Sequence, residues 1–244
     1  MRMEQVKSYL RPVRNWLQDL TKPRVERLNK KYDRDTVCII ASLPNDAVCI
    51  DIGASSGSIL KEMIHLVPRG RFFAFEARPE AAQRLQEHFP EVETHAVALS
   101  NEVGTATFHV VEENLGYSGL RRQDYPGGST VREITLPVDL LDNIIPHDLD
   151  ITFIKLDVEG AEYNVLQGAS EICRRSRPLI VFEYGLAGRD NYSTTPAMIF
   201  NLLASLGLKV SLLSAWLKGK HAMDLQTFER ACHKHYYFAA HPPR

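Results

Sequence analysis

The chain has 244 residues, of which 44% are hydrophobic and 24% charged, and its formal net charge is -1. This length suits one large α/β domain, or one domain with a small extension, and is enough to bury a sizeable core. The balanced charge excludes a global basic field that would attract nucleic acid. The four cysteines are widely spaced and form no C-x-x-C pair. They exclude a thiolate metal motif and suit a reducing cytoplasm better than a disulfide framework.

The first 36 residues differ from the rest, because ten Lys and Arg stand against five Asp and Glu. Five apolar residues recur there at helical spacing: Val6, Leu10, Val13, Leu17 and Leu20. We find no signal peptide and no apolar run long enough to span a membrane, and therefore expect a cytoplasmic protein. The sequence predicts an N-terminal helical extension over residues 1–36 and one domain over residues 37–244. The helix in this extension would pack on its own domain, form a contact with a second copy or another partner, or lie on a membrane surface, in falling order of preference. We expect a chain that starts near Tyr32 still to bind its ligand.

The remainder of the chain alternates between predicted helices and strands. In chain order we expect a helix (35–43), a strand (47–52), a helix (58–66), a strand (71–75), a helix (79–88), strands (93–99, 105–111, 132–137, 151–156), a helix (161–166), a strand (178–183), a helix (195–206) and strands (209–213, 235–240). Strands that alternate with helices predict a doubly wound, mostly parallel sheet.

The first strand runs directly into a turn of small residues, Gly53-Ala54-Ser55-Ser56-Gly57. Gly53 permits a tight turn and a close approach to a ligand, and Gly57 permits close packing of the next helix. The G-x-G-x-x-G fingerprint that cradles a pyrophosphate is broken, because position 55 is Ser. Asp51, two residues before Gly53, would repel a pyrophosphate but suit the ammonium and sulfonium of S-adenosylmethionine. We therefore favour S-adenosylmethionine over NAD; an NAD oxidoreductase and a ligand-free turn are the alternatives.

The second strand ends in an acid, Glu76. A carboxylate at this place can accept hydrogen bonds from both ribose hydroxyls of an adenosine cofactor. Because NAD enzymes use the same device, Glu76 indicates an adenosine nucleoside without choosing between the two cofactors.

Acids also follow two later strands, and we select three as candidate catalytic residues: Asp157, Glu159 and Glu183. Crowded carboxylates raise one another's pKa, and such a group could take a proton from a substrate hydroxyl. Asp157 or Glu159 could instead cap the following helix. We expect Glu162 to lie on a helix face. Although three carboxylates could hold a divalent cation, we predict no metal because a fourth protein ligand is lacking.

With these motifs, the sequence resembles the FkbM family of S-adenosylmethionine-dependent methyltransferases. The resemblance rests on residues 51–57, 75–79 and 96–100, and above all on the run Ile154-Lys-Leu-Asp-Val-Glu-Gly-Ala-Glu162. It implies the seven-stranded class I methyltransferase sheet, with the last strand antiparallel. It implies that the amino-acid end of the cofactor is lined by Asp51, Gly53, Ala54, Ser55 and Gly57.

The same resemblance assigns the remaining site residues. Glu76 would hold the ribose, Ala98 and Leu99 would border the adenine, Asp157 would lie near the methyl group and Glu159 near the substrate. It implies O-methylation of a small molecule, natural product or glycan, which is an analogy from the family. A methyltransferase-like binding module without catalysis is the alternative outside enzymes.

Two features concern the details of the site. The family commonly has Asn and an apolar residue where this chain has Ser55 and Ser56, which affects the fine contacts of the loop. Residues 114–130 form a predicted loop beside the site, with four candidate acceptor contacts: Tyr117, Arg121, Arg122 and Tyr125. The two arginines could meet an anionic acceptor or be solvated.

Overall fold

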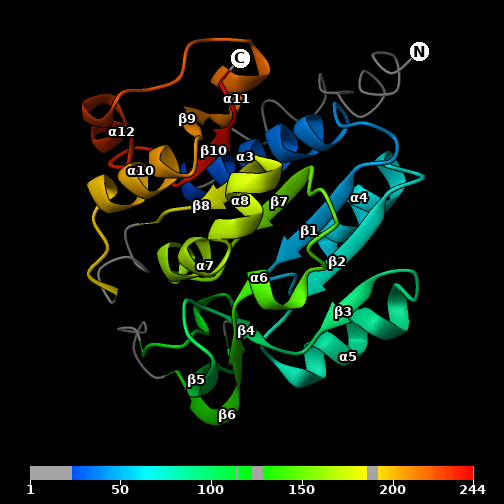
Figure 1. Ribbon diagram of the computed structural model, residues 1–244. Coiled ribbons are helices and arrows are strands. Elements are labelled where there is room, and N and C mark those ends of the chain that lie inside the picture. Colours follow the sequence, from blue (N-terminus) through cyan, green and yellow to red (C-terminus); the bar gives the residue numbers. More distant parts are fainter. Residues whose placement is uncertain (1–23, 114, 123–128, 186–191, 244) are drawn as a thin grey trace.

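A seven-stranded sheet forms the centre of the computed structural model, which describes residues 24–113, 115–122, 129–185 and 192–243. The strand order is β3-β2-β1-β7-β8-β10-β9 (Figure 1). The strands are β1 (Val48–Ile52), β2 (Arg71–Phe75), β3 (Glu93–His95), β7 (Phe153–Leu156), β8 (Leu179–Glu183), β9 (Lys209–Leu212) and β10 (Tyr237–His241). β10 runs antiparallel to both of its neighbours, β8 and β9. The predicted fold, a mostly parallel sheet with an antiparallel last strand, is confirmed.

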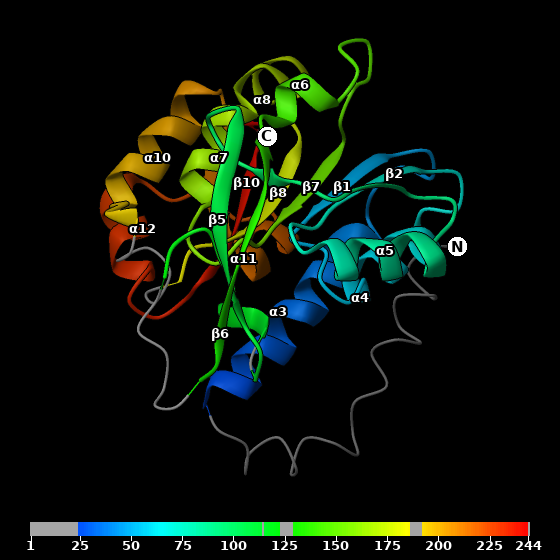
Figure 2. The ribbon, with the colours of Figure 1, turned by 90° about the horizontal axis from the view of Figure 1, so that it is seen from below.

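Helices cover both faces of this sheet (Figure 2). One face carries α3 (Arg24–Ile40), α4 (Ser58–Leu66), α5 (Pro79–His88) and α11 (Leu213–Leu217). The other carries α6 (Leu141–Ile144), α7 (Glu162–Gly168), α8 (Ser170–Ser176), α10 (Pro196–Ser205) and α12 (Leu225–Ala231). Alternate residues of a strand point to opposite faces. In β1, Cys49 therefore belongs to the core under α3 and α4, whereas Ile50 and Ile52 belong to the core under α7 and α10.

A second, three-stranded sheet lies beside the main one, in the order β4-β6-β5. Its strands are β4 (Ala98–Leu99), β5 (Gly104–Val111) and β6 (Val131–Asp139), and β5 and β6 form a long antiparallel pair. The single strand predicted over residues 93–99 is therefore wrong. The chain leaves the main sheet after His95, and Ala98 pairs instead with Val138 of the second sheet.

The helix predicted over residues 35–43 is longer and begins earlier, because α3 runs from Arg24 without a break across the expected boundary at residue 36. It is anchored by Tyr32, which is 3% exposed. The Tyr32 ring packs against Tyr236 and Tyr237 at centroid distances of 4.9 and 5.3 Å. The apolar series from Val6 to Leu20 lies outside the described residues.

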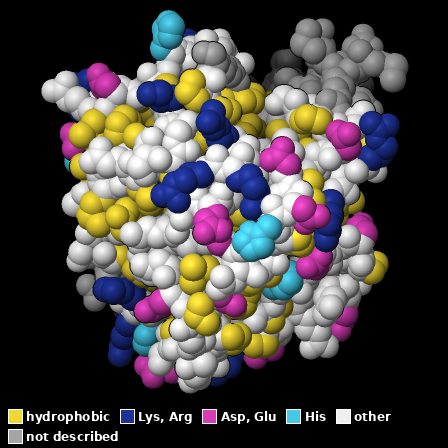
Figure 3. Space-filling view, viewed as in Figure 1, with side chains coloured by type: hydrophobic (Ala, Val, Ile, Leu, Met, Phe, Trp, Pro, Cys, Tyr) yellow, Lys and Arg dark blue, Asp and Glu magenta, His cyan; other side chains and the backbone are white. Residues whose placement is uncertain are grey.

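Side chains of both charges are interspersed on the face of the molecule shown in Figure 3, in keeping with the net charge of -1. All four cysteines are free thiols. Over the part of the chain that the structure describes, none of the helices has the length and apolar character needed to cross a membrane.

Candidate active site

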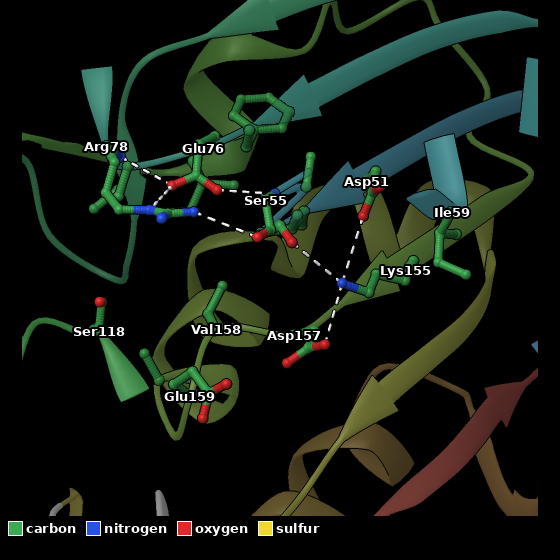
Figure 4. Close-up of a pocket in the computed structure, with 18 of the residues that line it drawn as sticks. Asp51, Ser55, Ile59, Glu76, Arg78, Ser118, Lys155, Asp157, Val158 and Glu159 are labelled. Atoms are coloured by element: carbon green, nitrogen blue, oxygen red, sulfur yellow. Dashed lines mark hydrogen bonds and ion pairs between the residues drawn. The ribbon is translucent and has the colours of Figure 1, made fainter. Parts of the chain in front are cut away.

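A cavity of about 310 Å³ opens at the edge of the main sheet where β1, β2, β7 and β8 end (Figure 4). The antiparallel strand β10 begins at this same edge, since Tyr237 pairs with Glu183, the last residue of β8. In open α/β sheets, ligands bind beyond the carboxyl ends of the strands. The cavity is lined by nine of the predicted site residues: Asp51, Gly53, Ala54, Ser55, Glu76, Ala98, Leu99, Asp157 and Glu159.

Asp51 is the most deeply buried carboxylate of the cavity wall, with 1% of its surface exposed. Neither of its carboxylate oxygens has a hydrogen-bond partner within the described residues. The nearest cation is Lys155, whose Nζ lies 3.7 Å from Asp51 Oδ1. Burial raises the pKa of Asp51, and the charge of Lys155 opposes that shift. Two buried, unsatisfied acceptors beside a cavity are costly, and they suit a ligand that brings hydrogen-bond donors or positive charge.

Lys155 connects three parts of the site. Besides Asp51, its ammonium donates to the carbonyl oxygen of Gly53 at 3.2 Å and lies 3.2 Å from Asp157 Oδ2. Burial alone would lower the pKa of Lys155, but the charges of Asp157 and Asp51 raise it above its ordinary value. The ammonium therefore stays charged and links the loop after β1 to the loop after β7.

The Asp157 carboxylate is held from several sides. In addition to Lys155, the Tyr237 hydroxyl donates to Asp157 Oδ2 at 2.5 Å. Burial favours the neutral form, but the charge of Lys155 and the hydrogen bonds of Glu183, Tyr237 and Lys155 lower the pKa of Asp157 to about 2. Asp157 is therefore ionised at neutral pH and is a weak base.

Glu159 and Glu183 behave in the opposite way. Burial and the charge of Asp157 raise the pKa of Glu159 to about 8 and that of Glu183 well above its usual range. A hydrogen bond between Glu183 and Asp157 contributes to the raised pKa of Glu183. The cluster thus combines an ionised Asp157 with a Glu159 that titrates close to neutral pH.

Glu76 lies at the other end of the cavity. Its Oε1 accepts from the backbone amide and the Nε of Arg78, at 3.0 and 2.9 Å. Its Oε2 accepts from the amide of Ser55 at 2.9 Å, so Glu76 also shapes the turn after β1. Arg78 Nη2 in turn lies 3.4 Å from the Ser55 hydroxyl (Figure 4).

An apolar wall from the second sheet and its neighbours flanks Glu76. Ala98 and Leu99 are buried in this wall. Its other members were not predicted from the sequence: Phe108, Leu115 and Leu120. Ser118 adds a hydroxyl (Figure 4). This wall offers a flat apolar ring a place to pack next to the Glu76 carboxylate.

Two of the predicted site residues, Gly57 and Glu183, are not part of the cavity lining. Gly57 does not line the cavity; a Cβ there would lie 2.6 Å from Phe89 and 2.8 Å from Leu85, so this glycine serves the packing of α4 on α5. Glu183 is not among the lining residues either, because it stands behind Asp157. Its contribution to the site passes through Asp157.

The expected acceptor loop is also different. Tyr117, Arg121 and Arg122 do not line the cavity, and Tyr125 lies outside the described residues. The Arg121 guanidinium instead lies over the ring of Tyr192, 5.0 Å from its centroid. Among the described residues of this loop, those that line the cavity are apolar or neutral: Leu115, Ser118 and Leu120.

The C-terminal half of α3, at the end of the predicted extension, contributes to the site. Asp33 and Thr36 of α3 line the cavity, and Thr36 is 3% exposed. The sequence analysis separated this segment from the glycine loop by chain position, but α3 packs directly against α4, the helix that follows that loop.

Lys155 and Tyr237 were not among the predicted site residues. Lys155 belongs to the run that carries the family resemblance, but its role follows only from its register opposite Asp51 in the parallel pair of β1 and β7. Tyr237 could have been found from the expected antiparallel last strand, because the first residues of such a strand lie at the edge where parallel strands end.

One oxygen from each of Asp157, Glu159 and Glu183 lies within 4.8 Å of the others. Asp157 is also held by Lys155 and Tyr237, so this carboxylate is the centre of the cluster.

Comparisons with known proteins find sequence similarity to methyltransferases. The chain is 29% identical over 155 residues to the 2-O-methyltransferase NoeI of Sinorhizobium fredii, covering 57% of this chain and 63% of that protein. It is 24% identical over 172 residues to Methyltransferase 1 of Beauveria bassiana, covering 62% of this chain and 69% of that protein. The chain thus spans a little under two thirds of the length of NoeI.

Among solved structures, the chain is similar to the methyltransferase FkbM from Methylobacillus flagellatus, with a TM-score of 0.50 and 16% identity, covering 82% of this chain and 44% of that one. That likeness concerns the fold. The family model described as the methyltransferase FkbM domain matches residues 51–210, which include the last two residues of β1 and the whole of β2, β7 and β8. The chain belongs to the FkbM methyltransferase domain family.

Proposed function

We propose that this chain is an S-adenosylmethionine-dependent methyltransferase that methylates a hydroxyl oxygen of a small molecule or glycan. The observation that carries the proposal is the buried Asp51 carboxylate with its two unsatisfied oxygens beside the glycine loop. The amino group of the cofactor would satisfy them. The relationship to NoeI, a 2-O-methyltransferase by name, supports an oxygen acceptor.

The rest of the cavity fits the same nucleoside. The apolar wall of Ala98, Leu99 and Phe108 suits the adenine ring, and Glu76 beside it suits the ribose hydroxyls. Ser55 and Ser58 offer neutral donors to the cofactor carboxylate at the start of α4. A dinucleotide would place its pyrophosphate next to Asp51, which disfavours the NAD alternative.

When bound, the cofactor supplies an electrophilic methyl group on a sulfonium. The protein must hold the acceptor oxygen in line with that methyl group and remove the hydroxyl proton as the bond forms. Glu159 suits the second task, because a base works best when its pKa lies near the operating pH. Asp157, with a pKa of about 2, suits the positioning of the acceptor and the stabilisation of positive charge instead. We therefore favour Glu159 over Asp157 as the base.

Calorimetry with S-adenosylmethionine, S-adenosylhomocysteine and NADH tests the cofactor. We expect heat with the two sulfur nucleosides and none with NADH. Asp51→Asn keeps the shape of the side chain and removes its charge, so it should weaken nucleoside binding by roughly 10-fold or more, the scale of a lost charged hydrogen bond. Asp46→Asn, at an exposed position before β1, is the matched control and should bind as the wild type does. Absence of heat with both sulfur nucleosides at high micromolar concentration would contradict the proposal.

A screen with labelled S-adenosylmethionine identifies the acceptor class. Neutral hydroxyl compounds and sugars come first, because the cavity is rich in carboxylates and its cations, Lys155 and Arg78, are paired with them. Nucleoside binding without turnover of any acceptor would favour the alternative of a non-catalytic binding module.

A further inference from the structure

Glu162 is a buried carboxylate that is not among the residues lining the cavity. It lies on a helix as expected, at the first position of α7, but only 2% of it is exposed. Its side chain folds back over the preceding loop. There, Oε1 accepts hydrogen bonds from the backbone amides of Val158 at 3.0 Å and Gly160 at 3.2 Å.

The residue between those two amides is Glu159. Its φ is 56°, in the left-handed region, and that of Gly160 is 107°. A non-glycine residue in this region costs on the order of 1–2 kcal/mol and persists only where its surroundings hold it. The two hydrogen bonds of Glu162 hold the backbone on both sides of Glu159. The side chains of Val158 and Glu159 both lie at the cavity, next to Asp157 (Figure 4).

We propose that Glu162 is a positioning residue, which fixes the left-handed turn at Glu159 by binding the amides of Val158 and Gly160 and so presents the Glu159 carboxyl to the cavity beside Asp157. The inference deepens the proposed function, since it rests on Glu159 as the base for its catalytic meaning. The geometric part stands on the described contacts alone.

The competing explanation is that Glu162 only stabilises the start of α7. A carboxylate at a helix N-terminus interacts favourably with the helix dipole. The two explanations differ in what they require. A helix-start role needs a negative charge at this position, whereas the positioning role needs a side chain long enough to reach both amides.

Two substitutions separate these requirements. Glu162→Gln keeps the length and an acceptor oxygen but removes the charge. Glu162→Asp keeps the charge, and Asp is well accepted at the start of a helix, but it is one methylene too short to reach both amides. Amide hydrogen exchange at Val158 and Gly160, and the titration of the Glu159 carboxyl by carbon-13 NMR, are then measured on the ligand-free protein.

We expect Glu162→Asp to speed exchange at both amides by roughly 10-fold or more, the change that follows from a lost hydrogen bond of about 1.4 kcal/mol. Its Glu159 should titrate roughly one unit or more below the wild-type midpoint, because the carboxyl leaves the buried cluster. Glu162→Gln should keep the slow exchange, with a smaller decrease in the midpoint from the loss of one nearby charge.

An Asp variant with wild-type exchange and midpoint would overturn the proposal, as would a Gln variant in which both amides lose protection. If the Asp variant does not fold, the Gln variant alone decides, because the two explanations predict opposite results for it. These readouts need neither cofactor nor acceptor, so failure of the proposed function appears separately, as absence of nucleoside binding. With an acceptor in hand, Glu162→Asp should lower kcat by roughly 10-fold with little change in nucleoside affinity, and Glu162→Gln should restore it.

Discussion

Asp51 and Lys155 stand directly opposite each other on the neighbouring parallel strands β1 and β7, and Lys155 Nζ lies 3.7 Å from Asp51 Oδ1. The ammonium of Lys155 also contacts Asp157, so one buried cation faces two carboxylates. Removal of one member of a buried ion pair leaves an uncompensated charge, which is strongly destabilising.

Lys155→Met should therefore lower the free energy of unfolding by about 3–5 kcal/mol. Urea denaturation measures the change. The double variant Lys155→Met with Asp51→Asn should recover part of the loss, because it leaves the Asp157 carboxylate as the one uncompensated partner of the missing ammonium instead of two. Arg71→Met, which breaks the exposed ion pair with Glu93, is the control and should cost less than about 1 kcal/mol. If Lys155→Met and Arg71→Met lower the free energy of unfolding by the same amount, Lys155 is not strongly coupled to the buried carboxylates.

Tyr237→Phe removes the hydroxyl that donates to Asp157 at 2.5 Å. Loss of this hydrogen bond should raise the pKa of Asp157 and loosen its carboxylate, so we expect turnover to fall by roughly 10-fold with little change in nucleoside affinity. Steady-state kinetics and calorimetry check the two parts. Tyr236→Phe is the matched control, because its hydroxyl donates to Asn29, away from the cavity. A Tyr237 variant with wild-type kcat would show that this hydroxyl is dispensable.

The pH dependence of turnover should report Glu159. Burial and the charge of Asp157 raise the pKa of Glu159 to about 8, and only the ionised carboxylate can accept a proton. The plot of kcat against pH should therefore rise through an acidic limb with a midpoint near 8. Glu159→Gln should remove the limb and lower kcat by roughly 10²-fold. A limb that persists in this variant would assign it to another group.

The same shift predicts a dependence of stability on pH. The folded state holds the Glu159 proton up to about pH 8, whereas an unfolded Glu releases it near its ordinary value of 4.5. The contribution of Glu159 to the free energy of unfolding is therefore present at low pH and is lost as pH rises from about 4.5 to 8. Glu159→Gln should increase stability at pH 8 relative to the wild type by at least roughly 1 kcal/mol and flatten this part of the curve. Urea denaturation at pH 5 and pH 8 measures the difference.

Truncation tests the part played by α3. Removal of residues 1–23 leaves α3 complete, and we expect nucleoside binding to persist. Removal of residues 1–36 deletes the anchor Tyr32 and the cavity residues Asp33 and Thr36, so binding should be lost or the fold destabilised. Calorimetry measures nucleoside binding and circular dichroism measures folding, so together they distinguish these outcomes. Light scattering on the same proteins tests whether the first segment supports a homodimer. Wild-type nucleoside affinity after the longer deletion would show that Asp33 and Thr36 are not needed for binding.

The sequence predicted site residues well where an acidic side chain stands at the end of an apolar strand. Asp51 lies near the end of one apolar strand, and Glu76 and Asp157 each directly follow another. Because parallel strands end at one edge of a sheet, the sequence predicts that these three acids lie together. The sequence was less informative where a partner lies far along the chain. Lys155 is defined by its register opposite Asp51, and Glu162 by a loop that curls back under its own side chain.

Short helices were missed for a related reason. α6, α11 and α12 contain four, five and seven residues, so their apolar positions complete at most two turns and give little periodic signal. The division of residues 93–99 between two sheets was equally hidden, because the apolar character of Val97 to Leu99 is the same whichever sheet receives it.

Gly53 has a consequence for the engineering of this site. A Cβ at Gly53 would lie 1.8 Å from the backbone carbonyl oxygen of Asp157, so the turns after β1 and β7 touch through their main chains. Lys155 joins the same two turns by donating to the Gly53 carbonyl. The turn after β1 and the acidic turn after β7 lie about a hundred residues apart in the chain. Because they are in direct contact, a shift of one turn must displace the other. A chimera that exchanges only one of these turns with another family member should therefore lose the close main-chain contact between them. An exchange of both turns together should keep that contact.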